Sequence, residues 1–372
     1  MIKHSLNFVI LFFTFISCNT SVKEEGNIQI LDLDMRKDSV LKVAEVKCIP
    51  LETREESLFH EMSKVICRNN KFYIFDRKGK SILIFDHHGS FMRKIHAAGS
   101  GPEEYVEPSD IDVDERGNIY VADNSTQRIV VFPESPNETI SVIAIDRYFL
   151  EFAVADSDFI YLSDVVSDGK MNIKLAKYNR QSKKLDIIEE SNLNNNGKVS
   201  RFAKHYFYRS NEMLYYYKRF SPYIYRISGD ESIIDFKIKS KWFPTKDKVM
   251  EWEAEGMQAV IEDAKYIRDI SACYETNNDL FLVSQTTPSL YTVLNKKTGN
   301  IYNSFFFNDK RLDECIHVLS SDGKYYVSSC PPTSKTVSYI LSENSSIDPI
   351  CLKRIESLTE DSNPVLVLFR FD

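Results

Sequence analysis

Short apolar segments separated by polar turns run along most of the chain, and two pairs of them repeat closely. Phe72–Asp76 is followed after five residues by Ile82–Phe85, and Ile119–Asp123 is followed after five residues by Ile129–Phe132. The tyrosine, the aspartate and the closing phenylalanine of the first unit recur 47 residues later in the second. Apolar runs of this length between polar turns are typical of β-strands, so each unit predicts an antiparallel strand pair.

Further strands complete the repeating unit. A short strand and turn precede each pair, and Ser90–His96 follows the first pair as a fourth strand. Four antiparallel strands per roughly 40–50 residues is the pattern of a β-propeller blade. Fainter copies of the strand pair begin near Phe159, Met213, Leu280 and Lys324. We therefore predict an all-β fold, a six-bladed β-propeller with four-stranded antiparallel blades, and the lack of alternating helices excludes a parallel α/β sheet.

The two ends of the chain supply the strands that would close this ring. Val40–Ile49 precedes the first blade, and Val365–Phe371 ends the chain. An open ring would leave an unpaired sheet edge. We expect both segments to join the last blade, so that the N-terminal strand fastens the circle.

Two segments interrupt the rhythm of strands and predict helices. Residues 244–266, after the fourth blade, carry apolar positions at helical spacing, and Thr245 is a candidate N-cap. Gly256 lies inside this insertion and weakens a helix by about 1 kcal/mol. A short C-terminal helix is predicted to begin at Asp348 and Pro349, which suit an N-cap and a first turn.

The N-terminus predicts a targeting segment. Lys3 precedes an apolar run, Leu6–Ile16, that is too short to span a bilayer, which needs roughly 20 residues. Such a run is typical of a secretory signal. It ends at Cys18, which resembles the acylated cysteine of bacterial lipoproteins. An ordinary signal peptide with an incidental cysteine is the alternative.

These features define the expected domains. Residues 1–17 form a lipoprotein signal peptide, residues 18–38 form a flexible tether, and residues 39–372 form the propeller, with the helical insertion at 244–266. The protein is expected to lie in the cell envelope, lipid-anchored to the outer membrane on its periplasmic or outer side.

Composition narrows the partners. Apolar residues make up 43% and charged residues 27% of the 372 residues, and the formal net charge is −7. An acidic protein is a poor partner for nucleic acid. Six cysteines follow Cys18, at spacings that match no zinc pattern: Cys48, Cys67, Cys273, Cys315, Cys330 and Cys351. Disulfides are permitted in an exported protein, but free cysteine is among the most buried residue types, and we expect buried thiols.

Several motifs resemble a known group of proteins. They are Pro50–Thr53, Met62–Val65, Ile82–Asp86, Gly99–Tyr105 and Asn363–Leu366. These are similar to the six-bladed β-propeller lipoproteins of gut Gram-negative bacteria, relatives of NHL-repeat propellers. In that family the glycine loop usually reads Gly-x-Gly-Pro-Gly-Glu-Tyr, and here Glu103 replaces the last glycine. The resemblance implies the fold and an envelope location, and it implies no established reaction.

The first candidate ligand-binding residues lie in this glycine loop: Glu103, Glu104 and Tyr105. The loop links the outer strand of one blade to the inner strand of the next, and loops on a rigid scaffold often carry function. Tyr105 offers a ring for a sugar or a peptide. The alternative is an interblade turn in which Tyr105 packs in the groove between two blades.

The other candidate ligand-binding residues are Arg219, Tyr223 and Trp252. The first two lie in a segment rich in tyrosine and basic residues, a composition that suits carbohydrate faces or anionic groups. Trp252 lies in the helical insertion. The alternatives are that the tyrosines pack within their blade and that Trp252 anchors the helix.

Two patterns that suggest metal binding have simpler explanations. Asp110, Asp112 and Asp114 lack the glycine and glutamate positions of an EF-hand. His87 and His88 are adjacent on a predicted strand and point to opposite faces. The sequence contains no Gly-x-Ser-x-Gly motif. It therefore predicts no metal and no cofactor, and it names no catalytic residue.

Two functions remain open from the sequence. The first is a binding or scaffold module that is tethered to the membrane through its lipid and presents one propeller face to a glycan, a peptide or a partner envelope protein. The second is a propeller enzyme, such as a lactonase or a glycan lyase or hydrolase, with its site at the channel mouth; its only support is fold analogy.

Overall fold

The computed structural model describes residues 28–35, 38, 40–155, 158–167, 170–190, 205–218, 220–313, 315, 317–342 and 347–371. Cys18 and the rest of the predicted signal peptide lie outside these residues.

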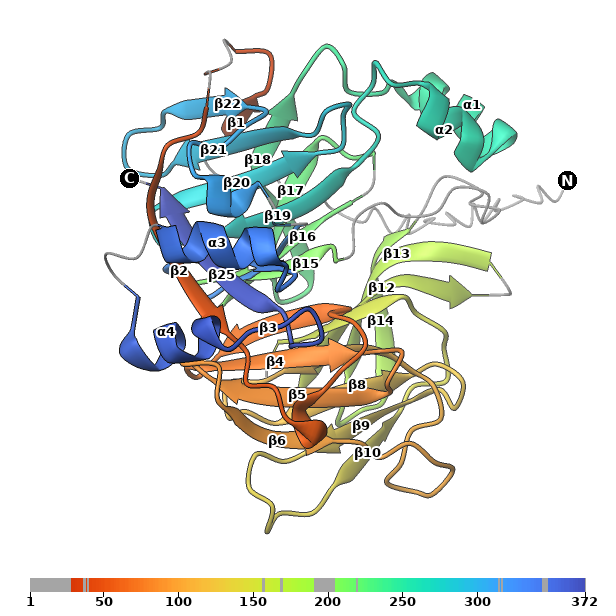
Figure 1. The fold of residues 1–372 in the computed structure, drawn as a ribbon. Helices are drawn as coiled ribbons and strands as arrows, with labels where there is room; N and C mark the ends of the chain where they lie inside the picture. The colour runs from red at the N-terminus through yellow and green to blue at the C-terminus, as the bar shows by residue number, and fades with distance from the viewer. Residues whose placement is uncertain are drawn as a thin grey trace, which may run out of the picture.

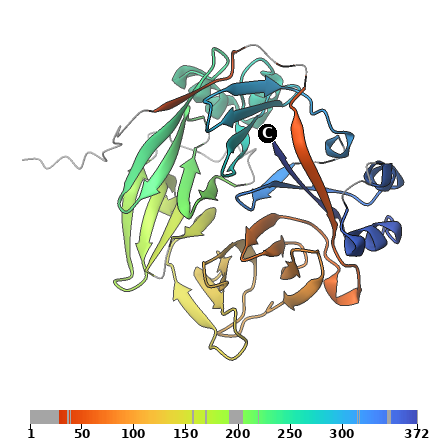
Figure 2. The ribbon, with the colours of Figure 1, turned by 90° about the vertical axis from the view of Figure 1, so that its left-hand side faces the viewer.

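Six antiparallel sheets follow one another around a ring, in the order of the chain (Figures 1 and 2). Blade 1 contains β3 (Lys64–Arg68), β4 (Lys71–Asp76), β5 (Ser81–Asp86) and β6 (Phe91–Ile95). Blade 2 contains β7 (Pro108–Val113), β8 (Ile119–Asp123), β9 (Arg128–Phe132) and β10 (Ser141–Ala144). Blade 3 contains β11 (Glu151–Val154), β12 (Phe159–Ser167), β13 (Lys170–Asn179) and β14 (Lys184–Glu190). The predicted six-bladed propeller is confirmed.

The remaining blades follow the same plan. Blade 4 contains β15 (Phe207–Ser210), β16 (Met213–Tyr217), β17 (Tyr223–Ser228) and β18 (Glu231–Lys239). Blade 5 contains β19 (Ile270–Glu275), β20 (Asp279–Ser284), β21 (Leu290–Asn295) and β22 (Ile301–Ser304). Blade 6 contains β23 (Val318–Ser321), β24 (Tyr326–Cys330), β25 (Val365–Phe371) and β2 (Val43–Pro50). In every blade the strand that comes first in this order, β3, β7, β11, β15, β19 or β23, is the innermost.

The ring closes in blade 6, as predicted. The N-terminal strand β2 pairs antiparallel with the C-terminal strand β25, with Cys48 opposite Val367. Three strands of this blade therefore come from the end of the chain and the outermost one from its beginning. No blade can separate from its neighbour at this point without breaking the β2–β25 ladder.

Part of the expected tether is ordered. β1 (Gln29–Asp32) adds a fifth strand to blade 4, parallel to β18, with Leu31 opposite Ile238. The side chains of Leu31 and Leu33 are almost fully buried there. These residues are held by the edge of β18 and by the apolar surface beside it. A tether predicted from composition alone does not reveal this strand pairing, because the pairing depends on the folded blade.

Helices occupy the two predicted interruptions. α1 (Lys246–Glu255) begins at Thr245, whose hydroxyl accepts a hydrogen bond from the Lys248 amide at 3.3 Å. Gly256, at φ 101°, separates α1 from α2 (Met257–Glu262).

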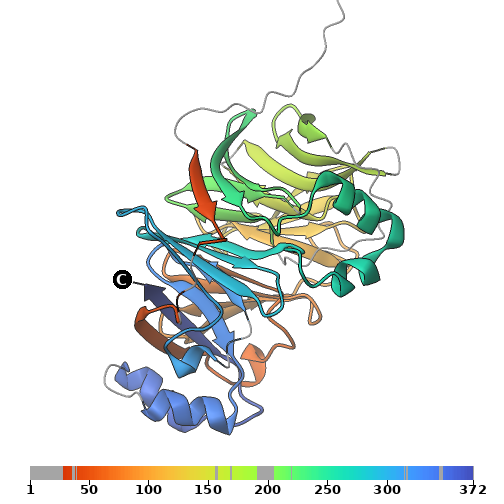
Figure 3. The same cartoon turned by 90° about the horizontal axis from the view of Figure 1, so that it is seen from above.

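Asp348 caps α4 (Pro349–Glu356), as predicted. α3 (Ser334–Ser342), between β24 and α4, was not predicted. The structure also has 3₁₀ turns η1 (Glu55–Ser57) and η2 (Lys310–Leu312). Figures 1 and 3 show α1 and α2 on a different part of the rim from α3 and α4. Among the described residues, no helix is long and apolar enough to cross a bilayer.

The core consists of apolar layers between neighbouring blades. At the seam between blades 5 and 6, for example, Phe281 packs against Tyr326 and Phe369, with ring centroids 5.2 and 6.1 Å apart. The six cysteines of the described residues are free thiols; Cys48, Cys273 and Cys330 are buried in such layers, and Cys351 is buried on α4.

The repeated aspartate explains why the strand pair recurs. Asp76 accepts hydrogen bonds from the Gly79 amide in the following turn and from the His60 amide in the preceding segment, both at 2.9 Å. Asp123 likewise accepts from the Ser125 amide at 3.0 Å and from the Val106 amide at 2.7 Å. Each aspartate therefore caps its own turn and holds the segment that leads into the blade.

Candidate functional site

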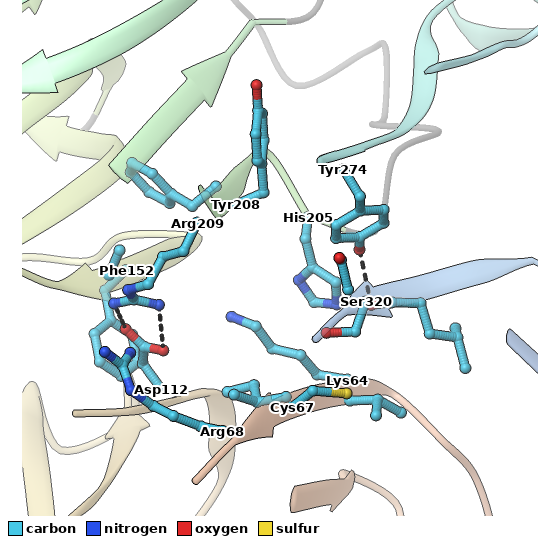
Figure 4. Close-up of a pocket in the computed structure, with 16 residues that line it drawn as sticks. Lys64, Cys67, Arg68, Asp112, Phe152, His205, Tyr208, Arg209, Tyr274 and Ser320 are labelled. Atoms are coloured by element: carbon cyan, nitrogen blue, oxygen red, sulfur yellow. Dashed lines mark hydrogen bonds and ion pairs between the residues drawn. The ribbon is translucent and has the colours of Figure 1, made fainter. Parts of the chain in front are cut away.

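A cavity of about 80 Å³ lies on the axis of the ring, where the innermost strands of all six blades meet (Figure 4). Each blade contributes to its lining, through residues that include Lys64, Asp112, Phe152, Arg209, Tyr274 and Ser320. The channel brings together charged residues that are far apart in the sequence.

Three buried carboxylates tie neighbouring inner strands together. Asp110 and Asp112 of β7 accept hydrogen bonds from the Phe152 and Val154 amides of β11, at 3.1 and 2.7 Å. Glu151 of β11 accepts from the amide of Tyr206, next to β15, at 2.9 Å. Since these carboxylate oxygens accept hydrogen bonds from main-chain amides of the next blade, they stabilise the ring. They also place negative charge close to its axis.

Arg209 pairs with Asp112 through both ends of its guanidinium group. Its two terminal nitrogens donate to the two carboxylate oxygens at 3.0 and 2.6 Å, and one of them also donates to the Val154 carbonyl at 2.6 Å. Burial acts to raise the pKa of Asp112, but the charge and hydrogen bonds of Arg209, together with the Lys64 charge and the Val154 amide, outweigh burial and hold that pKa below its usual value. Asp112 is therefore a fully ionised, structural carboxylate.

Lys64 begins the inner strand of blade 1 and is 9% exposed. Its ammonium donates to Asp110 at 2.9 Å and lies 3.8 Å from Glu151. Burial acts to lower the pKa of Lys64, but the charges of Asp110 and Glu151 outweigh it and raise that pKa. An ammonium group carries three donors, and within the described residues this one makes a single hydrogen bond. Figure 4 shows it extending between Arg209 and His205.

His205 completes the charged wall. Its Nδ1 lies 3.4 Å from a Glu151 oxygen, and its Nε2 lies 3.2 Å from the Ser63 carbonyl oxygen. Both ring nitrogens therefore face protein oxygens.

Arg68 lies at the far end of β3, where it donates to the Val113 carbonyl at 3.1 Å and to Glu212 at 2.6 Å. Its contacts tie the inner strand of blade 1 to blade 2 and blade 4.

The wall from blades 5 and 6 is mainly uncharged. Tyr274 donates to the Leu319 carbonyl at 2.8 Å, and Ser321 donates to the Glu275 carbonyl at 2.7 Å. The Glu275 carboxylate accepts hydrogen bonds from Tyr208 and Lys296, at 2.9 and 2.7 Å. Hydrogen-bond donors are thus concentrated on the side of the cavity built from blades 1 and 4.

The predicted glycine-loop residues lie away from this cavity. Tyr105 is fully buried, donates to the Lys80 carbonyl at 2.9 Å and packs edge-on against Phe132. Its ring fills the groove between blades 1 and 2, as the packing alternative describes. Glu103 is exposed, and Glu104 accepts a hydrogen bond from the Gly101 amide at 2.7 Å within the loop.

The second predicted group is also dispersed. Arg219 lies outside the described residues. Tyr223 is half-buried on β17, 6.2 Å from the Tyr225 ring. Trp252 is 1% exposed and packs against Phe220 and Tyr266, so it anchors the helical insertion. A ligand-binding role for these residues stays a prediction.

Sequence reasoning missed the residues that meet at the axis, Lys64, Glu151, His205 and Arg209. Asp110 and Asp112 were noticed, but only as an incomplete calcium motif. The available signal was positional: these residues lie on or next to the first strand of a blade, which is the innermost strand. No cluster of three or more His, Cys, Asp or Glu side chains that suits a metal ion occurs in the described part of the chain.

Residues 27–370 match the model of a family that is described as a domain of unknown function, DUF4934. The chain belongs to the DUF4934 family. No curated protein is significantly similar in sequence to this DUF4934 chain.

Solved structures share the DUF4934 fold. A Bacteroides fragilis protein thought to be exported is 18% identical, with a TM-score of 0.72, and the alignment covers 93% of this chain and 100% of that one. A DUF4221 family member from Bacteroides vulgatus is 13% identical, with a TM-score of 0.54, and the alignment covers 89% and 97% of the two chains. At these identities the likeness shows the fold alone.

Proposed function

We propose that this protein is a lipid-anchored envelope module that binds a ligand through a carboxylate group at the axial cavity. One observation carries the proposal: the Lys64 ammonium extends into the cavity with donors to spare, beside Arg209 and His205. The ligand's body would lie outside the cavity, on the propeller face.

The surrounding contacts support a preorganised anion site. The carboxylates nearest to Lys64 have oxygens that bind amides of the neighbouring blade, which fixes their positions before any ligand arrives. A buried donor without a full set of protein acceptors gains a strong hydrogen bond from an anionic ligand, because electrostatic interactions are stronger in a low local dielectric. A cavity of about 80 Å³ admits a carboxylate or several waters, but not a whole sugar ring.

Binding to sugar acids provides the direct test. We expect glucuronate to bind the protein in titration calorimetry and glucose to bind at least about tenfold more weakly, the difference that one charged hydrogen bond makes. Lys64→Met, which keeps the length of the side chain, should remove this preference. Equal binding of glucuronate and glucose, or an unchanged preference in Lys64→Met, would reject the proposal.

A matched control separates binding from folding. Lys64→Met leaves Asp110 without its cation, and the double variant Lys64→Met with Asp110→Asn removes that unpaired charge. If the double variant unfolds like the parent protein on heating but binds no glucuronate, the loss is specific to the site.

The envelope location rests on the signal-like N-terminus and on Cys18. The B. fragilis protein with the same fold is also thought to be exported. Mass spectrometry of the mature protein should show an acylated Cys18 at its N-terminus, and Cys18→Ser should release the protein into the soluble fraction. A mature chain without acyl groups would reject the lipid anchor.

An enzyme is the second candidate, and one pair of residues favours it. His205 Nδ1 and Glu151 Oε1 lie 3.4 Å apart, close to Lys64. Histidine is the side chain that acts most often as a general base, and a neighbouring ammonium would neutralise a uronate carboxylate, as lyase chemistry requires. Turnover of polyuronates into products with the absorbance of an unsaturated uronic acid, lost in His205→Gln, would support this function.

A further inference from the structure

A second cavity, of about 350 Å³, lies at the seam between blades 5 and 6, where the chain passes from β1 to β2. The described residues that line it come from three parts of the chain. Asp38, Val40, Leu41 and Lys42 form one wall, Asp279, Val293 and Tyr302 of blade 5 form another, and Phe371 of blade 6 completes the lining. We call this cavity the seam pocket. Small-molecule sites are typically concave, mostly apolar and roughly 300–1,000 Å³ in volume, and the seam pocket lies at the lower end of that range.

The walls of the seam pocket are held in place by hydrogen bonds. The Leu41 amide donates to the Phe306 carbonyl at 2.8 Å, and the Leu41 carbonyl accepts from the Asn308 amide at 3.0 Å. The Asp38 amide donates to the Asn303 carbonyl at 2.7 Å. The described residues of this wall are therefore held against blade 5, and the pocket is preformed.

Asp279 is the unusual member of this lining. It is 1% exposed, and no hydrogen bond or ion pair reaches its carboxylate from the described residues, with Oδ1 buried and without a partner. Buried side-chain oxygens nearly always have a hydrogen-bond partner, so an orphaned carboxylate in a preformed pocket indicates a missing ligand group.

The cations nearest to Asp279 do not neutralise it. Lys296 pairs with Glu275 at 2.7 Å, and Arg370 pairs with Glu45 at 2.9 Å. Lys297 lies close enough only for a long-range effect, and Lys42 lines the pocket from an exposed position. Burial raises the pKa of Asp279 to about 6 despite the charges of Lys296, Lys297 and Arg370. The carboxylate is ionised at neutral pH, where its negative charge has no direct partner.

The remaining lining suits a cation with an apolar body. Val293 and Leu41 are aliphatic, and the rings of Tyr302 and Phe371 border the same space. Aromatic faces attract ammonium groups, and aromatic rings beside an acid are the usual recognition of organic ammonium ions. We propose that the seam pocket binds a small organic ammonium ion, a primary amine with an apolar substituent, through Asp279.

2-Phenylethylamine tests this proposal, with 2-phenylethanol as its neutral counterpart. We expect the amine to bind at pH 7 in titration calorimetry, and the alcohol to bind at least about tenfold more weakly because it cannot pair with the carboxylate. Amine affinity should fall about tenfold between pH 7 and pH 5, as Asp279 takes up a proton. The other charged groups that face this region are Asp38, Lys42, Lys296, Lys297 and Arg370.

Variants identify the group responsible. Asp279→Asn keeps the shape of the side chain and should abolish both the preference for the amine and its pH dependence. Tyr302→Leu, at a position that is 42% exposed, should weaken the amine several-fold and keep the pH dependence, and it serves as the test should Asp279→Asn not fold. Lys64→Met, in the axial cavity, should leave amine binding unchanged. Unchanged amine affinity in Asp279→Asn, equal affinity for the alcohol, or no binding of the amine at millimolar concentration would overturn the proposal.

Discussion

Asp112 at the axis and Asp279 at the seam between blades 5 and 6 are equally buried, at 2% and 1% exposure, but their surroundings treat the charge in opposite ways. Asp112 accepts a two-point pair from Arg209 and a main-chain hydrogen bond from Val154, and its pKa is lowered. Asp279 has no such partner, and burial raises its pKa to about 6.

The difference shows that burial alone does not mark a functional carboxylate. The energetic cost of burying Asp112 is offset within the protein, so this residue belongs to the architecture of the ring. The cost of burying the Asp279 carboxylate is not offset within the described residues. A cationic ligand that paired with this carboxylate would offset that cost. At the axis, the corresponding group is the ammonium of Lys64, whose donors outnumber its hydrogen bonds.

The largest expected effect comes from removing the partner of Asp112. Arg209→Met should lower the free energy of unfolding by about 3–5 kcal/mol, because it leaves a buried, uncompensated carboxylate. Urea denaturation at pH 7 measures this loss. The low pKa of Asp112 stabilises the fold above the unfolded value near 3.9, and this contribution disappears as the pH falls through the folded value, so the loss should shrink in acid.

The double variant Arg209→Met with Asp112→Asn is the control. It should recover most of the lost stability, since no unpaired charge remains. A loss below about 1 kcal/mol in the single variant would show that the pair is not the structural element described here.

At the seam between blades 5 and 6, removing a buried charge should raise the free energy of unfolding instead of lowering it. Asp279→Asn should raise the free energy of unfolding by about 1–3 kcal/mol at pH 8, because the folded pKa of Asp279 exceeds its unfolded value by about two units. The penalty of the native carboxylate develops between about pH 4 and pH 6 as the unfolded chain ionises first, so parent and variant should converge at pH 4. Thermal unfolding across this range measures the difference, and a destabilised variant at pH 8 would mean that Asp279 is already neutralised.

The smallest effect on stability is expected at the seam between blades 1 and 2, where the Tyr105 hydroxyl already has two hydrogen-bond partners. Tyr105→Phe removes a hydroxyl that donates to the Lys80 carbonyl and accepts from the Ala97 amide, and should cost about 1 kcal/mol. Tyr326→Phe, which removes a hydroxyl that donates to the Asp279 carbonyl at 2.9 Å, is the matched change at the other seam and should cost a similar amount. An unchanged midpoint in urea for Tyr105→Phe would reopen the possibility that this residue serves a ligand instead of the fold.

The propeller was predictable from the sequence because its signals are local. The tyrosine and aspartate of each strand pair recur at a fixed distance, and the structure shows that the aspartate caps the turn within its own blade. The closure by β2 and β25 followed from the need to leave no open sheet edge. The free state of the cysteines was predictable on other grounds, because a large apolar core needs no disulfides to be stable.

The candidate sites were not predictable because no local pattern contains them. Lys64, Glu151 and His205 come from three blades and meet only when the ring is closed. The seam pocket likewise needs the chain before β2 to lie over blade 5, and residues such as Leu41 and Val293 are ordinary apolar positions in the sequence. Tyr105 and Trp252, which were conspicuous in the sequence, are both buried, because large aromatic rings fill the gaps between rigid elements, and their ligand-binding role stays a prediction.

The pairing of β1 with blade 4 and of β2 with blade 6 has a mechanical consequence. A pull on the amino end of the chain reaches β1 first, and its four-residue parallel ladder with β18 bears the load before the segment over the seam pocket does. Only after both have peeled away does the force act on the β2–β25 ladder that keeps the ring shut. Two weaker attachments, the β1–β18 ladder and the segment over the seam pocket, therefore lie ahead of the β2–β25 ladder along the path of the force. Tension at an anchored terminus would open the seam pocket before it opened the propeller.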